Sequence, residues 1–210
     1  MSKRFRRAFM KIIIIGLGLI GGSIAKALSS AQDYEIFAFD SDQQSIKNAL
    51  HNQSIQGSLN SLNDLESAEY SHSLVIISTP PSVTNDILKS LDFLFNSSVT
   101  ITDTTSSKSS LNITLQEFYF PKNFIFSHPV AGSHLSGEKN SVANLFDGKS
   151  TILSYHESVA SQHIDRVKSL WSKLGSNIKV LDIELHDQIF AYSQSSSSHS
   201  CICIIKYFKG

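Results

Sequence analysis

A glycine-rich segment near the N-terminus has the spacing of a loop that binds phosphate groups. It reads G-x-G-x-x-G and lies between the apolar run Lys11–Ile15 and a helix-like stretch. In such a loop the first glycine allows a tight turn and the second lets the backbone approach a pyrophosphate. The third lets the following helix pack closely on the strand, with its N-terminus facing the anion. The cofactor-binding residues expected in this segment are Gly16, Gly18, Leu19, Ile20 and Gly21.

An acidic residue ends the next apolar run. Asp40 closes Phe37–Asp40 and follows Gly16 at close to the roughly 20-residue distance expected of a ribose-binding acid. A carboxylate at this place accepts hydrogen bonds from the ribose hydroxyls and repels a 2′-phosphate, so the expected cofactor is NAD rather than NADP. The alternative is that the glycine segment is a structural turn and that Asp40 is an ordinary helix cap.

Further polar residues follow later apolar runs, where a crevice across the carboxyl ends of parallel strands binds its ligand. Thr79 and Pro80 follow one run, and Asp103 and Ser106 follow the next. We expect the first three to contact the cofactor, with strand-end capping as the alternative for Thr79. His128, held by a following proline, is well placed to act on a substrate, although a lone histidine is as often structural.

Short apolar runs alternate with amphipathic stretches from residue 11 onward. This alternation is typical of parallel βαβ units and predicts an α/β fold, a Rossmann-type doubly wound and mostly parallel sheet. The strands are expected at Lys11–Ile15, Glu35–Phe39, Leu74–Ser78, Val99–Thr102, Phe124–Phe126 and Thr151–Leu153. The helices are expected at Ile20–Ser29, Gln43–His51, Ser82–Phe93, Ser107–Phe118 and Ser158–Leu174, with Ser82 capping the third.

Composition excludes several classes of protein. The 210 residues carry 18 basic and 18 acidic side chains, which argues against a disordered chain and against a nucleic-acid binder. No apolar run reaches the roughly 18 residues of a membrane span. The cysteines are Cys201 and Cys203, so the first 200 residues hold no disulfide and no thiolate metal site, as expected for a cytoplasmic protein without a metal. The basic leader followed by Ile12–Ile20 also resembles a signal peptide, which is the competing interpretation.

The motifs together resemble the prephenate dehydrogenase family of tyrosine biosynthesis, whose substrate is prephenate or arogenate. The resemblance covers about residues 11 to 192, and its most specific parts are H-P-V-A-G-S and the later His-Asp pair. The matching segments are Gly16–Ser23, Thr102–Lys108, His128–Ser133 with Ser136–Gly137, Leu145–Gly148 and His186–Asp187.

The resemblance implies NAD-dependent oxidative decarboxylation of a small-molecule substrate. In this chemistry His128 accepts the proton of the substrate hydroxyl or polarises the developing carbonyl, and Ser106 hydrogen-bonds that hydroxyl. Lys108 is expected to be a structural residue of a helix first turn, and Asp187 a helix cap. The residues implied to bind substrate are Ser133, His134 and His186.

Two departures from the family pattern change the expectation. His134 occupies a position where the family commonly has an acidic or amide residue, which leaves open whether prephenate or arogenate is preferred. The family continues after the His-Asp pair into S-H-x-x-H. In this chain Ser195 and Ser198 occupy the positions of the two histidines of that motif. Both belong to a serine run, which a shift of reading frame after codon 192 would explain.

The expected organisation is therefore a basic leader (1–10), an NAD-binding domain (11–181) and a remnant of a helical substrate and dimerisation domain (182–210) that begins with a helix and then stops. The family homodimer would be weakened by this truncation. The alternative to an active prephenate dehydrogenase is a non-catalytic remnant that at most binds NAD.

Overall fold

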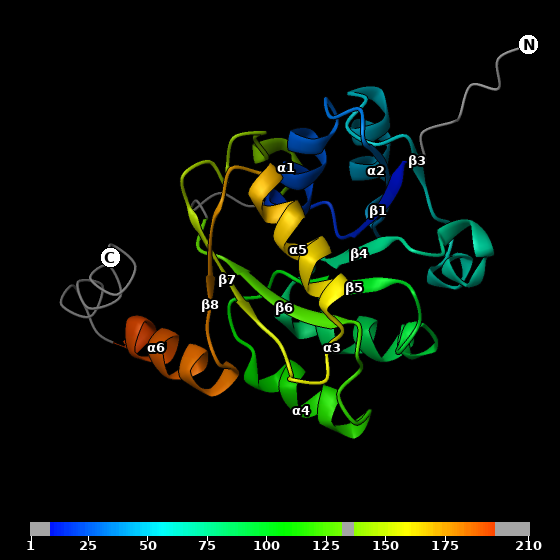
Figure 1. The fold of residues 1–210 in the computed structure, drawn as a ribbon. Coiled ribbons are helices and arrows are strands. Elements are labelled where there is room, and N and C mark those ends of the chain that lie inside the picture. Colours follow the sequence, from blue (N-terminus) through cyan, green and yellow to red (C-terminus); the bar gives the residue numbers. More distant parts are fainter. Residues whose placement is uncertain (1–8, 132–136, 196–210) are drawn as a thin grey trace, which may run out of the picture.

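The computed structural model describes residues 9–131 and 137–195 (Figure 1). In these ranges the chain forms one eight-stranded sheet. The strands are β1 (Met10–Ile15), β2 (Tyr34–Phe39), β3 (Gly57–Ser58), β4 (Leu74–Ile77), β5 (Thr100–Asp103), β6 (Phe124–Pro129), β7 (Ser150–Ser154) and β8 (Asn177–Val180).

In the described part of the chain, six α-helices connect or follow these strands. They are α1 (Leu19–Leu28), α2 (Gln43–His51), α3 (Pro81–Ser90), α4 (Ser109–Glu117), α5 (Ser161–Lys173) and α6 (Ile183–Ser195). Short 3-10 turns lie at Leu62–Glu66, Ala68–Tyr70, Asp92–Leu94 and Glu138–Asn140.

The order of the strands determines where a ligand can bind. The sheet runs β3-β2-β1-β4-β5-β6-β7-β8, so the chain moves outward from β1 to β3 and then crosses back to β4 on the other side of β1. All pairs are parallel except β6 and β7, which are antiparallel. In an open sheet the reversal between β1 and β4 leaves a crevice at the carboxyl ends of these strands.

Helices cover both faces of the sheet, because its central strands are apolar on both sides. Alternate residues of β1 belong to two separate cores: Ile12 and Ile14 pack with α1, α2 and α5, whereas Ile13 and Ile15 pack with α3 and α4. The first core also contains Trp171, the only tryptophan of the chain.

The predicted α/β architecture is confirmed, with differences at particular elements. Strand β8 was not predicted, because Asn177–Val180 is short and only partly buried. Helix α3 begins at Pro81, so Ser82 lies inside the helix and is not its N-cap. Proline suits the first turn of a helix, because its missing N–H is not needed there. Helix α4 begins at Ser109, with Lys108 as its N-cap residue.

The ends of the chain are described only in part. Met10 pairs with Tyr34 and so belongs to β1, not to the leader; the rest of the leader apart from Phe9 lies outside the described residues. Helix α6 confirms the helix expected after residue 182, and it packs on α4. Cys201, Cys203 and the end of the serine run lie outside the described residues.

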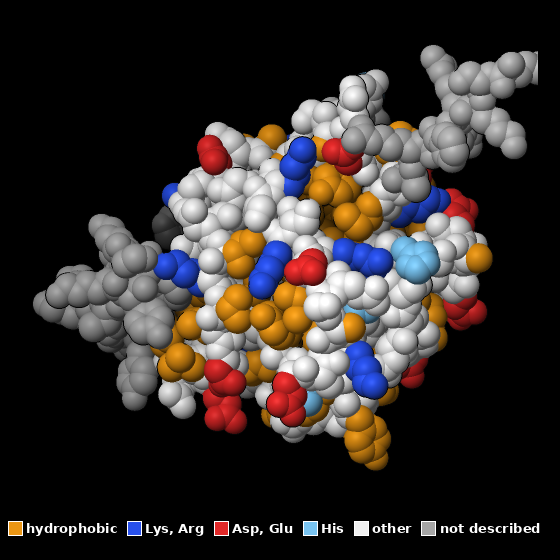
Figure 2. All heavy atoms as spheres, viewed as in Figure 1, with side chains coloured by type: hydrophobic (Ala, Val, Ile, Leu, Met, Phe, Trp, Pro, Cys, Tyr) orange, Lys and Arg blue, Asp and Glu red, His pale blue; other side chains and the backbone are white. Residues whose placement is uncertain are grey.

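The described surface is mixed in charge. On the face shown in Figure 2, basic and acidic side chains are interspersed, with apolar side chains between them. Within the described ranges, no helix has the length and apolar character needed to cross a bilayer.

Candidate active site at the carboxyl ends of the strands

The glycine loop has the close contacts expected of its spacing. Gly16 adopts a φ of +96°, and a Cβ there would lie 2.5 Å from the carbonyl oxygen of Ser78 on β4's side of the crevice. A Cβ on Gly21 would lie 2.0 Å from the carbonyl oxygen of Gly16, so only glycine lets α1 approach the loop this closely. A Cβ on Gly18, in contrast, would meet no atom within 4 Å. The loop is thus tightly packed at Gly16 and Gly21 and open at Gly18.

The open side of the loop faces the start of α1. No side chain caps this helix, whose first turn follows Gly18 and contains no acidic residue. Backbone N–H groups at such an uncapped helix start attract anions. The loop therefore fits a phosphate-containing group.

Asp40 supports the loop from the neighbouring strand. Its Oδ2 accepts a hydrogen bond from the Leu17 backbone N–H at 2.6 Å, and its Oδ1 accepts one from the Asp42 N–H at 2.8 Å. The N-cap of α2 is Asp42, which accepts from the backbone N–H groups of Gln44 and Ser45. The alternative in which Asp40 itself caps α2 is therefore wrong.

Two adjoining cavities meet at the glycine loop. One, of about 470 Å³, is lined by Gly16, Gly18 and Asp40; the other, of about 660 Å³, extends from Gly18 to His128. Both volumes are in the range of small-molecule sites. Of the predicted site residues, the first cavity is lined by Gly16, Gly18, Asp40, Thr79 and Pro80. The second is lined by Gly18, Leu19, Ile20, Thr79, Pro80, Ser106 and His128.

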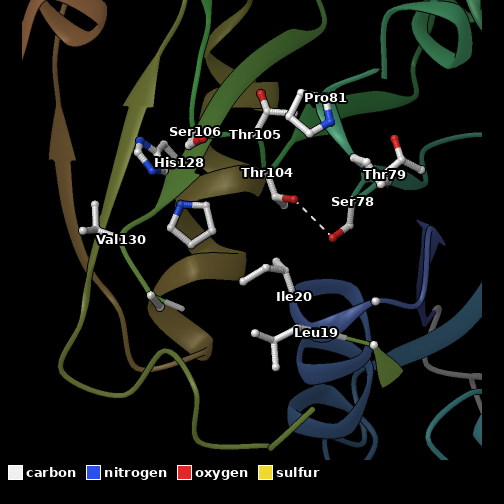
Figure 3. Close-up of a pocket in the computed structure, with 15 residues that line it drawn as sticks. Leu19, Ile20, Ser78, Thr79, Pro81, Thr104, Thr105, Ser106, His128 and Val130 are labelled. Carbon is white, nitrogen blue, oxygen red and sulfur yellow. Dashed lines mark hydrogen bonds between the residues drawn. The ribbon is translucent and has the colours of Figure 1, made fainter. Parts of the chain in front are cut away.

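The larger cavity has two unlike walls (Figure 3). Leu19 and Ile20 of α1 form one apolar side, whereas Ser106 and His128 lie together on the opposite side. Between them Thr104 donates a hydrogen bond to the Ser78 hydroxyl at 3.2 Å, which ties the end of β5 to the end of β4. Thr79, which lines both cavities, also contacts Thr84 of α3 at 3.0 Å between hydroxyl oxygens, so it both lines the crevice and supports the helix start.

Asp103 does not line the crevice, although it was predicted to contact the cofactor there. Its side chain is fully buried and lines neither cavity, because its carboxylate is engaged within the protein. Oδ2 pairs with the Lys108 ammonium at 2.6 Å, and Oδ1 accepts from the Ser127 N–H at 3.2 Å. The cofactor contact assigned to Asp103 is corrected to a buried ion pair beneath the crevice. Gly21 likewise lines neither cavity and serves the packing of α1.

Lys108 is a structural residue at the start of α4, as predicted, but it is also fully buried and ion-paired, which was not predicted. Its buried Nζ also donates to the Ser127 carbonyl at 2.7 Å, directly before His128. Burial lowers the pKa of Lys108, and the neighbouring Asp103 carboxylate opposes this shift. Its partner Asp103 is five residues away, but the spacing alone does not show that the two side chains are buried together.

His128 is 7% exposed at the cavity wall. Burial, and after it the nearby Lys108 cation and His186, lower the pKa of His128 to about 3. An imidazole in this environment is neutral at physiological pH, as a proton acceptor must be.

His186 lies behind His128 rather than at the cavity surface. It is fully buried, and its Nε2 lies 2.9 Å from Nδ1 of His128. Its other nitrogen, Nδ1, lies 2.7 Å from Oδ1 of Asp187. Asp187 also accepts from the Lys108 backbone N–H at 3.0 Å and from the Ser109 hydroxyl, so the cap expected of it is present, but on α4 and not on its own helix.

Two predicted substrate-binding residues and the expected absence of a metal site remain to be compared with the structure. Ser133 and His134, predicted to bind substrate, lie outside the described residues. In the described part of the chain, no three His, Cys, Asp or Glu side chains gather in a way that could hold a metal ion.

The sheet order, the glycine loop and the crevice define a nucleotide-binding domain of the Rossmann type with a buried histidine at one end. The chain matches the family described as "Prephenate dehydrogenase, nucleotide-binding domain" over residues 24–180. This match covers most of the chain, and the chain belongs to that family.

Known relatives agree with this assignment. Prephenate dehydrogenase of Lactococcus lactis is 33% identical over 183 residues, which are 85% of this chain and 48% of the relative. The crystal structure of Aquifex aeolicus prephenate dehydrogenase in complex with hydroxyphenyl propionate and NAD+ is 30% identical, with a TM-score of 0.78, and covers 87% of this chain and 63% of that one. Synechocystis arogenate dehydrogenase is 25% identical with a TM-score of 0.78, over 88% and 64% of the two chains. The chain thus spans about half to two thirds of the length of these relatives.

Proposed function

We propose that this chain is the dinucleotide-binding and proton-accepting part of an NAD-dependent prephenate dehydrogenase. The observation that carries the proposal is that the cavity beside His128, which is neutral, shares Gly18 of the glycine loop with the cavity beside Asp40. Family membership and the NAD+ complex of the Aquifex relative support it. In this proposal residues 11–181 form the nucleotide-binding domain, and a second unit begins near Asp182.

The residues present fit NAD. Asp40 would accept hydrogen bonds from the adenosine ribose, and the start of α1 beside Gly18 would hold the pyrophosphate. The nicotinamide would then reach the end of the crevice that contains Ser106 and His128, where it supplies the acceptor for a hydride from the substrate.

The residues of the chain handle the proton. Loss of a hydride from the ring carbon that bears the hydroxyl group turns that hydroxyl into a carbonyl, and His128 accepts the hydroxyl proton. When the carboxylate of the ring leaves as CO2, its bonding electrons make the ring aromatic and place a negative charge on this oxygen. The same proton can then return from His128, so that 4-hydroxyphenylpyruvate leaves as a phenol. Because His128 is neutral at physiological pH, its bare nitrogen is available to take up the proton.

Two observations favour other candidates. The likeness to Synechocystis arogenate dehydrogenase makes arogenate the alternative substrate. The described lining of the larger cavity contains no lysine or arginine to bind a substrate carboxylate, which favours a chain that binds NAD without turning substrate over.

The test is a direct assay of the purified 210-residue chain. NAD binding is measured by calorimetry, with NADP as the comparison, and turnover is measured as NADH formation with prephenate and separately with arogenate. The matched variant is His128→Asn, which removes the base at the cavity wall.

Prephenate-dependent NADH formation that His128→Asn abolishes, with its NAD affinity unchanged, would support the proposed dehydrogenase. NAD binding without turnover of either substrate would support the non-catalytic alternative. Failure to bind NAD would contradict both.

A further inference from the structure

The imidazole of His128 carries a proton on only one of its two nitrogens when it is neutral, and only the bare nitrogen can accept another proton. Which nitrogen is bare depends on the hydrogen-bond partners around the ring. The contacts behind His128 determine this choice, and this inference rests on the function proposed above.

The chain of contacts begins at a group that can only accept. The carboxylate of Asp187 has no proton to give, because hydrogen bonds from Ser109, His186 and the Lys108 backbone hold its pKa below the usual range despite its burial. The partner at 2.7 Å, Nδ1 of His186, must therefore carry a proton and donate it.

The next contact follows from the first. Burial lowers the pKa of His186, so its imidazole is neutral and its second nitrogen, Nε2, has a lone pair and no proton. The atom 2.9 Å from Nε2 is Nδ1 of His128, which must then be the donor. The proton of His128 is thereby held on Nδ1, and its Nε2 is left bare.

The pair of imidazoles is enclosed. The ring of Phe190 packs against both, with its centroid 4.5 Å from that of His128 and 4.8 Å from that of His186. With His186 fully buried, water is kept from offering His128 a competing donor. The other charged groups near this pair are the ammonium of Lys108 and the carboxylate of Asp103, which bond to each other and to the backbone of Ser127.

We propose that His186 and Asp187 are positioning residues that hold His128 in the tautomer protonated at Nδ1, so that its Nε2 is the base of the site. The arrangement has the logic of a hydrolase triad, in which a buried carboxylate orients a histidine without itself taking up the proton. Here a second histidine lies between the carboxylate and the base. We call the linked contacts of Asp187, His186 and His128 the relay. The contact of Asp187 with the start of α4 places it at the junction of α4 and α6.

The test reads the tautomer itself and needs neither cofactor nor substrate. The chain is labelled with ¹⁵N in its histidine rings, and long-range ¹H–¹⁵N correlation spectra at neutral pH distinguish protonated from bare ring nitrogens. The signals of His128 are assigned by their loss in His128→Gln. In the parent chain we expect a protonated Nδ1 and a bare Nε2.

Asp187→Ala is the informative variant, because it removes the oxygen that accepts from Nδ1 of His186. Without that acceptor the proton of His186 can lie on either nitrogen. We therefore expect the tautomer ratio of His128, protonated Nδ1 over protonated Nε2, to fall at least tenfold. Ser109→Ala is the matched control: it removes a contact of the same carboxylate at the start of α4 and leaves the relay intact, so its spectrum should keep the parent tautomer.

A second variant, His186→Gln, covers the case in which Asp187→Ala does not fold. It offers His128 either an amide oxygen or an amide nitrogen, and we expect a mixture of tautomers. A parent chain with the proton of His128 on Nε2 would overturn the proposal. So would an unchanged His128 spectrum in both relay variants. Lack of turnover in the enzyme assay, in contrast, bears on the proposed function and leaves this test valid.

Discussion

The two ends of the crevice are built in different ways. The dinucleotide end is made by the backbone of one short segment, residues 16–21, with Asp40 as its main side chain. The other end, which we call the proton-accepting end after the role proposed for His128, is made by side chains from β5, β6, α6 and the segment before α4. They bring two histidines, a lysine and two carboxylates together.

This difference separates two kinds of sensitivity. The dinucleotide end depends on the absence of side chains, since a Cβ added at Gly16 or Gly21 would meet a backbone oxygen. The other end depends on charges that are paired away from water, where a lost partner leaves an unsatisfied group. Replacements at the two ends should therefore fail for different reasons.

The largest loss of stability is expected from the buried ion pair. Lys108→Met leaves the carboxylate of Asp103 buried and unpaired, and breaking such a pair costs about 3–5 kcal/mol. Urea unfolding followed by the fluorescence of Trp171 measures the change. Adding Asp103→Asn to this variant removes the stranded charge and should restore part of the loss.

The matched control is Lys89→Met. This lysine pairs with Glu117 at 3.5 Å, but both side chains are about half exposed, and such a pair contributes roughly 0–1 kcal/mol. Equal losses in the two lysine variants would show that burial of charge does not distinguish the proton-accepting end.

The next largest effect is expected at the dinucleotide end. Gly21→Ala places a Cβ 2.0 Å from the Gly16 carbonyl oxygen, so α1 or the loop must shift, at a cost of about 1–3 kcal/mol. Gly18→Ala meets no atom within 4 Å and should leave the unfolding free energy unchanged while it obstructs NAD. Urea unfolding and calorimetric titration with NAD separate the two effects. If Gly18→Ala destabilised the fold as much as Gly21→Ala, the loop geometry described above would be wrong.

The same contrast explains what the sequence could predict. The glycine loop, Asp40 and most of the strands follow from short-range spacing and apolar periodicity, because each is decided by neighbours along the chain. Asp103 was misassigned since its position after a strand does not reveal that Lys108 turns back to pair with it. The contact of His186 with His128 depends on how α6 packs, and no local pattern encodes that packing.

Acid should destabilise the fold through the proton-accepting end. The folded pKa of His128, about 3, is below its value of roughly 6.5 in an unfolded chain. Between these values the unfolded state binds a proton that the folded state does not, so stability falls as pH drops from about 6.5 toward 3. One such histidine contributes up to about 1.4 kcal/mol per pH unit.

Urea unfolding between pH 7 and pH 4 should therefore show a shallower pH dependence in His128→Gln than in the parent chain. Replacement of the exposed His51 at the end of α2 by glutamine is the control, and its pH dependence should match the parent. Parallel curves for all three proteins would contradict a buried neutral His128.

A smaller effect on stability than those at Lys108 and Gly21 is expected at Asp40. Asp40→Asn retains one oxygen that can accept from either Leu17 or Asp42, but not a second acceptor for the other N–H, so the unfolding free energy should fall by about 1 kcal/mol. Its larger consequence is for cofactor choice, because the amide no longer repels a 2′-phosphate. We expect the preference for NAD over NADP, measured as a ratio of dissociation constants, to fall about tenfold, which corresponds to roughly 1.4 kcal/mol. A variant that kept the full preference would place the discrimination in some residue other than Asp40, and the dinucleotide end would then depend on more than one acidic side chain and the shape of its backbone.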